Sequence, residues 1–220
     1  MKKSWVVLFL ICVVSFNSCK KEEEEVEREE INIGNFSLLE SSGDSFPYQG
    51  KSGMIYVDSA NNEVVGAIVQ EYKGLGSQGR MVRDLSEVEK LARYQTEQNT
   101  VDIFLPDFNR TVRVKMSVQL DDFNRYPTNI KLADVISIIS YRQRESYTIE
   151  DNIEIIVNKR SSTRSNDQFN QVISTLDLNG KTFNNVYSDQ NNEMFVAYFT
   201  LEQGLVGFTD KEQNITYTIK

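Results

Sequence analysis

The chain has 220 residues, a formal net charge of −8, no histidine and only two cysteines, Cys12 and Cys19. Without imidazole, Ser-His-Asp and Cys-His nucleophile pairs are excluded, and zinc and most transition-metal sites lack their usual ligands. An acidic chain with no basic face repels phosphate backbones, so we expect no nucleic-acid partner, and no cofactor is indicated.

Residues 1–18 have the pattern of a secretory signal peptide. Lys2 and Lys3 precede an apolar run, residues 5–16. A helix needs roughly 20 residues to cross a bilayer, so this run is too short to span one. Its length and basic flank predict a cleaved leader.

Cys19 is the predicted site of lipidation. The sequence Phe16-Asn17-Ser18-Cys19 resembles a bacterial lipobox, although Phe16 and Asn17 depart from the usual pattern. The resemblance implies cleavage before Cys19 and three acyl chains, and each buried methylene contributes about 0.8 kcal/mol, which anchors the protein in a membrane. An ordinary thiol at Cys19 is the alternative.

An acidic stretch follows the cysteine. Residues 20–30 carry seven acids and three bases, so we expect residues 19–31 to form an extended, solvated tether. Cys-Lys-Lys-Glu-Glu also resembles the surface-export signal of Bacteroidota lipoproteins. That resemblance implies the outer membrane, with the body at the cell surface; a periplasm-facing position is the alternative.

The body, residues 32–220, is expected to be mainly β. Residues 32–49 predict an irregular entry segment or an edge strand, and residues 53–57 and 64–72 predict a hairpin. Its loop contains Asp58-Ser59-Ala60, which resembles the O-glycosylation tripeptide of exported Bacteroidota proteins and implies a sugar on Ser59. A plain Asp/Asn turn explains the same residues.

Two patterns lie between residues 74 and 98. Gly74 to Gly79 spells G-x-G-x-x-G, but we reject a dinucleotide site because no β-α-β alternation follows and the predicted helix begins too late. A flexible connector is expected there, with an anion-binding loop at Arg80 and Arg83 as the alternative. Residues 84–98 predict the single amphipathic helix, with Ser86 and Glu89 forming a capping box.

The next segments predict strands and turns. Strands are expected at 100–105 and 111–120, an ambiguous run at 130–141, and two short strands at 147–149 and 153–157 around a turn. The tetrapeptide Asp-Phe-Asn-Arg occurs at 107–110 and again at 122–125, which indicates equivalent turns. Residues 160–167 form the expected internal boundary.

Residues 169–220 predict a four-stranded antiparallel meander whose strongest signal is the Asn179-Gly180 turn. Acidic turns near 189–193 and 210–214 fit turn chemistry better than calcium loops. Residues 178–187, 204–208 and 216–219 resemble the end of uncharacterised flavobacterial lipoproteins. The resemblance implies location and β-richness, and no activity.

The sequence therefore predicts a mainly β (α+β), sandwich-like fold with antiparallel sheets, one amphipathic helix and a C-terminal meander. We expect a noncatalytic, lipid-anchored envelope protein that binds a protein or glycan partner or serves in an assembly. The alternative is a hydrolase with paired carboxylates drawn from Asp121, Asp122 and Glu145.

Overall fold

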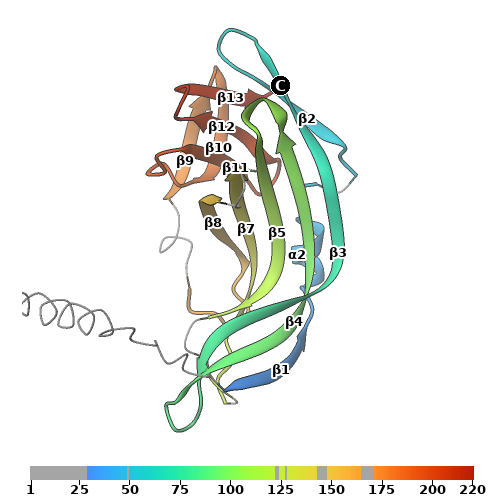
Figure 1. Ribbon diagram of the computed structural model, residues 1–220, viewed down its shortest axis with the longest axis vertical. Coiled ribbons are helices and arrows are strands. Elements are labelled where there is room, and N and C mark those ends of the chain that lie inside the picture. The colour runs from blue at the N-terminus through green and yellow to red at the C-terminus, as the bar shows by residue number, and fades with distance from the viewer. Residues whose placement is uncertain (1–28, 49, 122–123, 127, 143–147, 165–170) are drawn as a thin grey trace, which may run out of the picture.

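The computed structural model of the chain describes residues 29–48, 50–121, 124–126, 128–142, 148–164 and 171–220 (Figure 1). The mainly β prediction is confirmed. Beside a short helix, α2 (Glu40–Asp44), and a 3-10 turn, η1 (Pro106–Phe108), the strands are β1 (Glu30–Phe36), β2 (Gly53–Val57), β3 (Glu63–Arg83), β4 (Glu89–Leu105), β5 (Arg110–Leu120), β6 (Asn124–Arg125), β7 (Leu132–Arg142), β8 (Thr148–Asn158), β9 (Gln171–Leu178), β10 (Lys181–Ser188), β11 (Phe195–Thr200), β12 (Gly204–Asp210) and β13 (Ile215–Ile219). Within this described part, no helix has the length and apolarity needed to cross a membrane.

The described strands form one sheet in the order β8-β7-β5-β4-β3-β2-β13-β12-β11-β10-β9. Neighbours on this path are antiparallel, whereas β1 pairs with β4 and β6 pairs with β3 in parallel. The sheet curls strongly, so that β8 at one end approaches β10 and β11 near the other (Figure 1). Opposite parts of the sheet therefore face each other across one main core.

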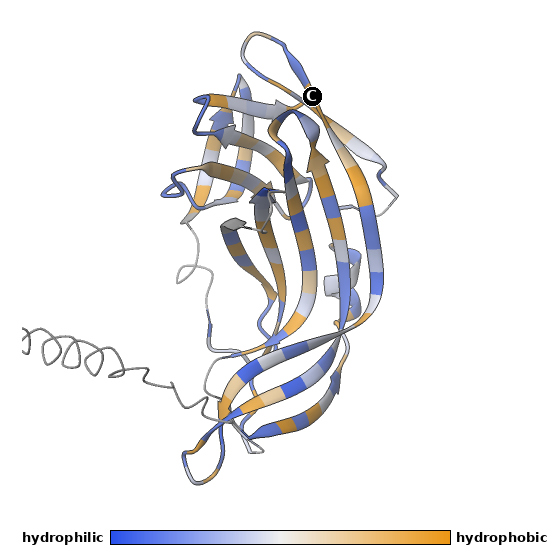
Figure 2. Ribbon diagram, viewed as in Figure 1, coloured by the Kyte–Doolittle hydropathy of each residue, from blue (hydrophilic) through white to orange (hydrophobic). Residues whose placement is uncertain are grey.

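The main core is rich in aromatic side chains gathered around Phe208. Its ring stacks on Phe195 and Tyr217, with centroids 5.4 and 5.1 Å away, and meets Tyr56 and Phe108 edge-on at 5.3 Å. Apolar and polar residues alternate along β4 and β5 (Figure 2), because successive side chains point to opposite faces of a strand. One face therefore supplies the core and the other stays polar.

The C-terminal strands form an antiparallel meander, as predicted, but with five strands instead of four. Every residue of β11 and β12 is buried. The β9–β10 hairpin covers the face opposite the main core, where Leu178, Phe183 and Val186 pack against Val196 and Val206. At its tip, the amide of Asn179 donates hydrogen bonds to the carbonyls of Thr216 (2.8 Å) and Val57 (3.1 Å).

The predicted helix over residues 84–98 is wrong. Residues 84–88 form the turn between β3 and β4, and residues 89–98 belong to β4. The Asp84 carboxylate accepts hydrogen bonds from the Ser86 amide and hydroxyl, so the apparent capping box serves a turn. Pairing with β3 outweighs the weak intrinsic helix preference of this segment. The expected connector at Gly74–Gly79 is also wrong, because these residues lie inside β3.

The strand β4 belongs to two structural units. Its second half, from Gln98 to Leu105, pairs with β5, whereas Leu91 to Thr96 pair with β1. Where β4 leaves β5, two of its side chains take over the hydrogen bonding. The Thr96 hydroxyl accepts from the Val118 amide at 2.9 Å, and the Tyr94 hydroxyl accepts from the Leu120 amide at 3.4 Å. The second half of β3, the first half of β4 and β1 thus form an arm, which we call the lower ribbon. It has its own small core at Val82, Ala92, Tyr94 and Leu120.

Other expectations need correction or lie outside the described residues. The two strands expected at 147–149 and 153–157 are one strand, β8, with no turn between them. The expected tether ends earlier than residue 31, because β1 begins at Glu30. Part of the second Asp-Phe-Asn-Arg copy and part of the expected boundary at 160–167 lie outside the described residues, and the main core contains residues from both sides of that boundary.

Residues 37–48 close one side of the curl through two buried polar groups. Asp134 on β7, which is fully buried, accepts hydrogen bonds from the Ser42 hydroxyl (2.6 Å) and the Leu39 amide (3.2 Å) and forms an ion pair with Arg160 at 2.6 Å. The hydroxyl of Tyr48 accepts from the Leu205 amide at 2.7 Å. These contacts fix the entry segment against the body.

Candidate functional site

The most distinctive surface in the described part of the chain is a strand edge on β3. β2 covers one end of this edge at Glu63–Ala67, and β6 covers the other end at Val82 and Arg83. On the side of β3 that faces away from β4, none of the described strands pairs with residues 69–79, which we call the open edge. It amounts to about 35 Å of strand, because each residue advances about 3.3 Å.

The backbone direction at the open edge follows from β6. The Arg83 carbonyl accepts a hydrogen bond from the Tyr126 amide at 2.9 Å, so it points away from β4. The amide and carbonyl groups of successive residues alternate between the two sides of a strand. The amides and carbonyls that face outward are therefore those of Glu71, Lys73, Leu75, Ser77 and Gly79.

Apolar side chains accompany this edge. Val69, Tyr72 and Leu75 are 60%, 40% and 56% exposed. The Tyr72 hydroxyl donates a hydrogen bond to the Leu75 carbonyl at 2.7 Å and thus satisfies one of the outward carbonyls. Exposed apolar residues next to unpaired backbone groups are the usual features of a surface that accepts an added strand.

Two glycines keep one face of the edge flat. A Cβ atom at Gly74 would lie 2.8 Å from the Tyr72 hydroxyl, and one at Gly76 would overlap the side-chain amide nitrogen of Gln98. The side chains of Tyr72 and Gln98 therefore lie across the positions that larger residues would occupy. This is the structural role of the G-x-G pattern, and no nucleotide is needed to explain it.

A hollow adjoins the open edge. It has a volume of about 280 Å³ and is lined by Phe46, Gly50, Glu71, Tyr72, Lys73, Asn99 and Thr100. Its size suits one or two side chains and is below the usual range for a small-molecule site. A strand laid along β3 could place a side chain there.

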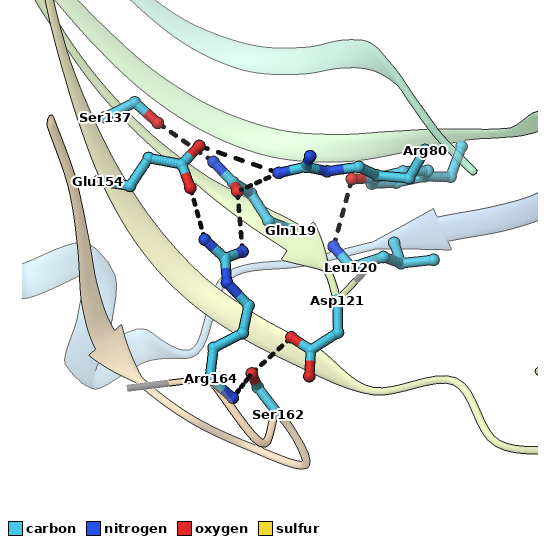
Figure 3. Close-up of polar contacts among 9 residues, drawn as sticks. Arg80, Gln119, Leu120, Asp121, Ser137, Glu154, Ser162 and Arg164 are labelled. Atoms are coloured by element: carbon cyan, nitrogen blue, oxygen red, sulfur yellow. Dashed lines mark hydrogen bonds and ion pairs between the residues drawn. The ribbon is translucent and has the colours of Figure 1, made fainter. Parts of the chain in front are cut away.

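A polar cluster joins the lower ribbon to the body on the other side of β4 (Figure 3). The Gln119 side-chain oxygen accepts hydrogen bonds from Arg80 (3.1 Å) and Arg164 (3.3 Å), and its nitrogen donates to the Ser137 hydroxyl (3.1 Å). Glu154 pairs with both arginines. Because Arg80 is engaged in this way, it does not form the anion-binding loop that was the alternative interpretation of the sequence.

Of the three carboxylates considered for a hydrolase, only Asp121 lies in the described part of the chain, so no catalytic pair among them can be identified. Asp121 accepts hydrogen bonds from the Ser162 hydroxyl and the Thr163 amide, at 2.5 and 2.9 Å, and is 5% exposed. Asp122 and Glu145 lie outside the described residues. A glycosidase would need two carboxyls about 5–10 Å apart across a cleft. Asp121 instead fastens the segment after β8.

The two predicted modification sites are Cys19 and Ser59. Cys19 lies outside the described residues, so its lipidation stays a prediction. Ser59 is exposed in the turn between β2 and β3, while the neighbouring Asp58 accepts hydrogen bonds from the Ala60 amide and the Asn62 amide, both at 2.8 Å. Glycosylation of Ser59 stays a prediction as well. Within the described ranges, no group of three or more acidic or cysteine side chains could hold a metal ion.

Sequence reasoning missed the open edge because it assigned residues 74–98 to a connector and a helix. A signal was present in the continuous alternation of β4, where Leu91, Arg93 and Gln95 alternate with Ala92, Tyr94 and Thr96. Comparisons with family models, with curated proteins and with solved structures return no match for this chain.

Proposed function

We propose that this chain is a noncatalytic, lipid-anchored envelope protein that binds an extended segment of a partner protein along the open edge of β3. The observation that carries the proposal is the stretch of β3 between β2 and β6 whose outward backbone groups have no described strand beside them. The anchor is the acylated Cys19, and the expected location is the outer membrane, with the body at the cell surface.

The chemistry of the edge favours a polypeptide over a glycan. Five residues direct both an amide donor and a carbonyl acceptor outward at the spacing of a strand, and only another backbone matches that pattern along its whole length. Val69 and Leu75 supply apolar contacts for alternate side chains of the partner. The charges of Glu71 and Lys73 lie two residues apart and help to set the register.

An experiment can test the proposal in cells that make the protein. A photoreactive phenylalanine analogue at Leu75 is used to cross-link neighbours, and the adducts are identified by mass spectrometry. The analogue is then combined with Ser77→Pro, which removes an outward amide, or with Ser77→Ala, which keeps it. Proline is tolerated at strand edges, so β3 and β4 stay paired.

We expect one partner adduct, cross-linked through a continuous segment. Ser77→Pro lowers its yield about tenfold, because each lost hydrogen bond costs about 1 kcal/mol and the proline ring also blocks close approach, while Ser77→Ala leaves it unchanged. Equal yields in the two variants contradict binding through the backbone edge. An adduct with a second copy of this chain also contradicts the proposal and identifies self-pairing instead.

A further inference from the structure

The turn at the end of the lower ribbon carries two outward apolar side chains. Leu85 is 72% exposed and Val88 is 53% exposed, and both lie in residues 84–88, which join β3 to β4. A shallow hollow beside Leu85 is lined by Ile31, Lys90 and Tyr126 among others. We call residues 84–88 the ribbon tip.

The ribbon tip has a fixed conformation. The Asp84 carboxylate accepts hydrogen bonds from the Ser86 amide (2.8 Å), the Ser86 hydroxyl (2.7 Å) and the Val88 amide (3.0 Å). It also forms an ion pair with Lys90 at 3.2 Å. Leu85 and Val88 are therefore held outward by an ordered turn.

The N-terminal segment enters the fold beside this tip. The Glu29 carbonyl accepts a hydrogen bond from the Leu91 amide at 3.0 Å, and the Glu29 carboxylate pairs with Lys90 at 2.9 Å. Glu30 pairs with Arg93 at 2.8 Å. Cys19 is ten residues before Glu29, so even a fully extended chain keeps it within about 35 Å of Glu29.

The turn between β2 and β3 is much farther from the point where the N-terminal segment enters the fold than the ribbon tip is. The turn between β2 and β3, which contains Ala60, lies at the other end of β3 from the ribbon tip (Figure 1). β3 has 21 residues and is therefore about 70 Å long along its path. An anchor at Cys19 keeps the ribbon tip near the bilayer, while the β2–β3 turn lies farther away.

We propose that the ribbon tip inserts Leu85 and Val88 into the interfacial layer of the bilayer that holds the Cys19 anchor; this inference rests on the proposed anchor. Burial of only two apolar side chains is too weak an interaction to hold the untethered body on a membrane. The anchor supplies the high local concentration that makes so weak a contact persist. Glu87, between the two apolar residues, limits the insertion to the headgroup level.

Tryptophan fluorescence provides the test, because the only tryptophan, Trp5, lies within the predicted leader. Leu85→Trp and the matched control Ala60→Trp are each made in the full chain, and the mature proteins are extracted from membranes and reconstituted in phosphatidylcholine vesicles. Vesicles with and without acyl-chain bromination are compared. The acyl mass at Cys19 and flotation with the vesicles are measured first.

For floating, acylated protein, we expect the Leu85→Trp emission to shift to shorter wavelength and to lose intensity with brominated lipid, while Ala60→Trp emission is unchanged. If neither variant is quenched, or if Ala60→Trp is quenched more, the tip contact is overturned and the anchor stands. If Cys19 carries no acyl mass, the proposed anchor fails. In that case, protein that begins at Cys19 is coupled through the Cys19 thiol to a maleimide lipid. Quenching of the Leu85→Trp emission in these samples supports the tip contact, and unquenched emission overturns it.

Discussion

The C-terminal meander and the lower ribbon are built from the same kind of strand but differ in what surrounds them. In β11 and β12 every residue is buried, because the main core covers one face and the β9–β10 hairpin covers the other. In the lower ribbon, exposed and part-buried residues alternate along β3 from Leu75 to Gly79. The difference shows how one sheet can combine a fully buried body with a strand edge that no described strand covers, because stability is not uniform across a structure.

The largest effect is expected from truncating the aromatic centre of the body. Phe208→Ala removes a ring that contacts four others, so it should lower the free energy of unfolding by about 3–5 kcal/mol. Leu75→Ala on the ribbon is the matched truncation and should change it by less than about 0.5 kcal/mol. Urea unfolding measures both. Equal losses would mean that the two regions are equally packed.

A smaller loss is expected at Gly204, where the body has no room for a side chain. Its φ is +86°, and a Cβ atom would lie 2.5 Å from the Tyr48 hydroxyl. Gly204→Ala should lower the free energy of unfolding by about 1–3 kcal/mol, because it strains the backbone and displaces the Tyr48 side chain. Gly43→Ala, which has open space around its Cβ position, serves as the control in thermal unfolding. An unchanged melting temperature for Gly204→Ala would contradict the close packing at this turn.

The junction between the lower ribbon and the body should be destabilised by loss of the Thr96 hydroxyl. Thr96→Val keeps the shape of the side chain but leaves the buried Val118 amide without its acceptor, which costs about 1–3 kcal/mol. Hydrogen exchange should accelerate at Val118 and Leu120 first. Thr175→Val, on exposed β9, is the control and should leave exchange there unchanged. Protection that survives in Thr96→Val would show that β4 and β5 do not depend on this contact.

The ribbon tip should keep its conformation in acid. The pKa of Asp84 is lowered to about 2, chiefly by the Ser86 hydroxyl and also by the Val88 amide and Lys90. A lowered pKa in the folded state stabilises the turn at pH values above the usual carboxyl range near 4, and this stabilisation is lost as the pH falls through about 2. NMR titration of Asp84 and exchange of the Val88 amide measure the effect. Ser86→Ala should raise the Asp84 pKa; an unchanged value would contradict this cause.

The smallest effect is expected at the open edge itself. Tyr72→Phe removes the hydroxyl that occupies the Leu75 carbonyl, and it should leave stability within about 0.5 kcal/mol of the original. The freed acceptor should increase partner cross-linking at Leu75 about two- to tenfold, which corresponds to one hydrogen bond. Tyr126→Phe, near β6, is the control. Reduced cross-linking in Tyr72→Phe would mean that the hydroxyl assists the partner.

Local patterns were sufficient to predict the meander and several central strands. Asn179-Gly180 requires positive φ at both positions, and the structure has φ values of 49° and 80° there. The alternation of β5 predicted its boundaries within one residue, because one of its faces is buried along the whole strand. In these places, local preference and tertiary packing favour the same structure.

The lower ribbon and the open edge could not be predicted in the same way. Leu85, Val88, Leu91 and Ala92 have helical spacing, and only pairing with β3 and β1 makes this segment a turn followed by a strand. An open edge depends on where β2 and β6 end along β3, which is a matter of long-range register. The hydrogen bonds of Asp84 and the ion pairs of Glu29 depend on the same register, so the sequence shows only their charges.

The parallel pairing of β1 with β4 has a mechanical consequence. If Cys19 is anchored as we propose, tension from the membrane would reach the fold at Glu29 and pull along the axis of β1, while the body resists at the far end of β4. The hydrogen bonds between two strands run across that axis, so the tension shears them all at once and does not peel them apart one by one. When a bound partner pulls on the body, the force would thus be borne by the β1–β4 pair, whose hydrogen bonds are loaded in shear.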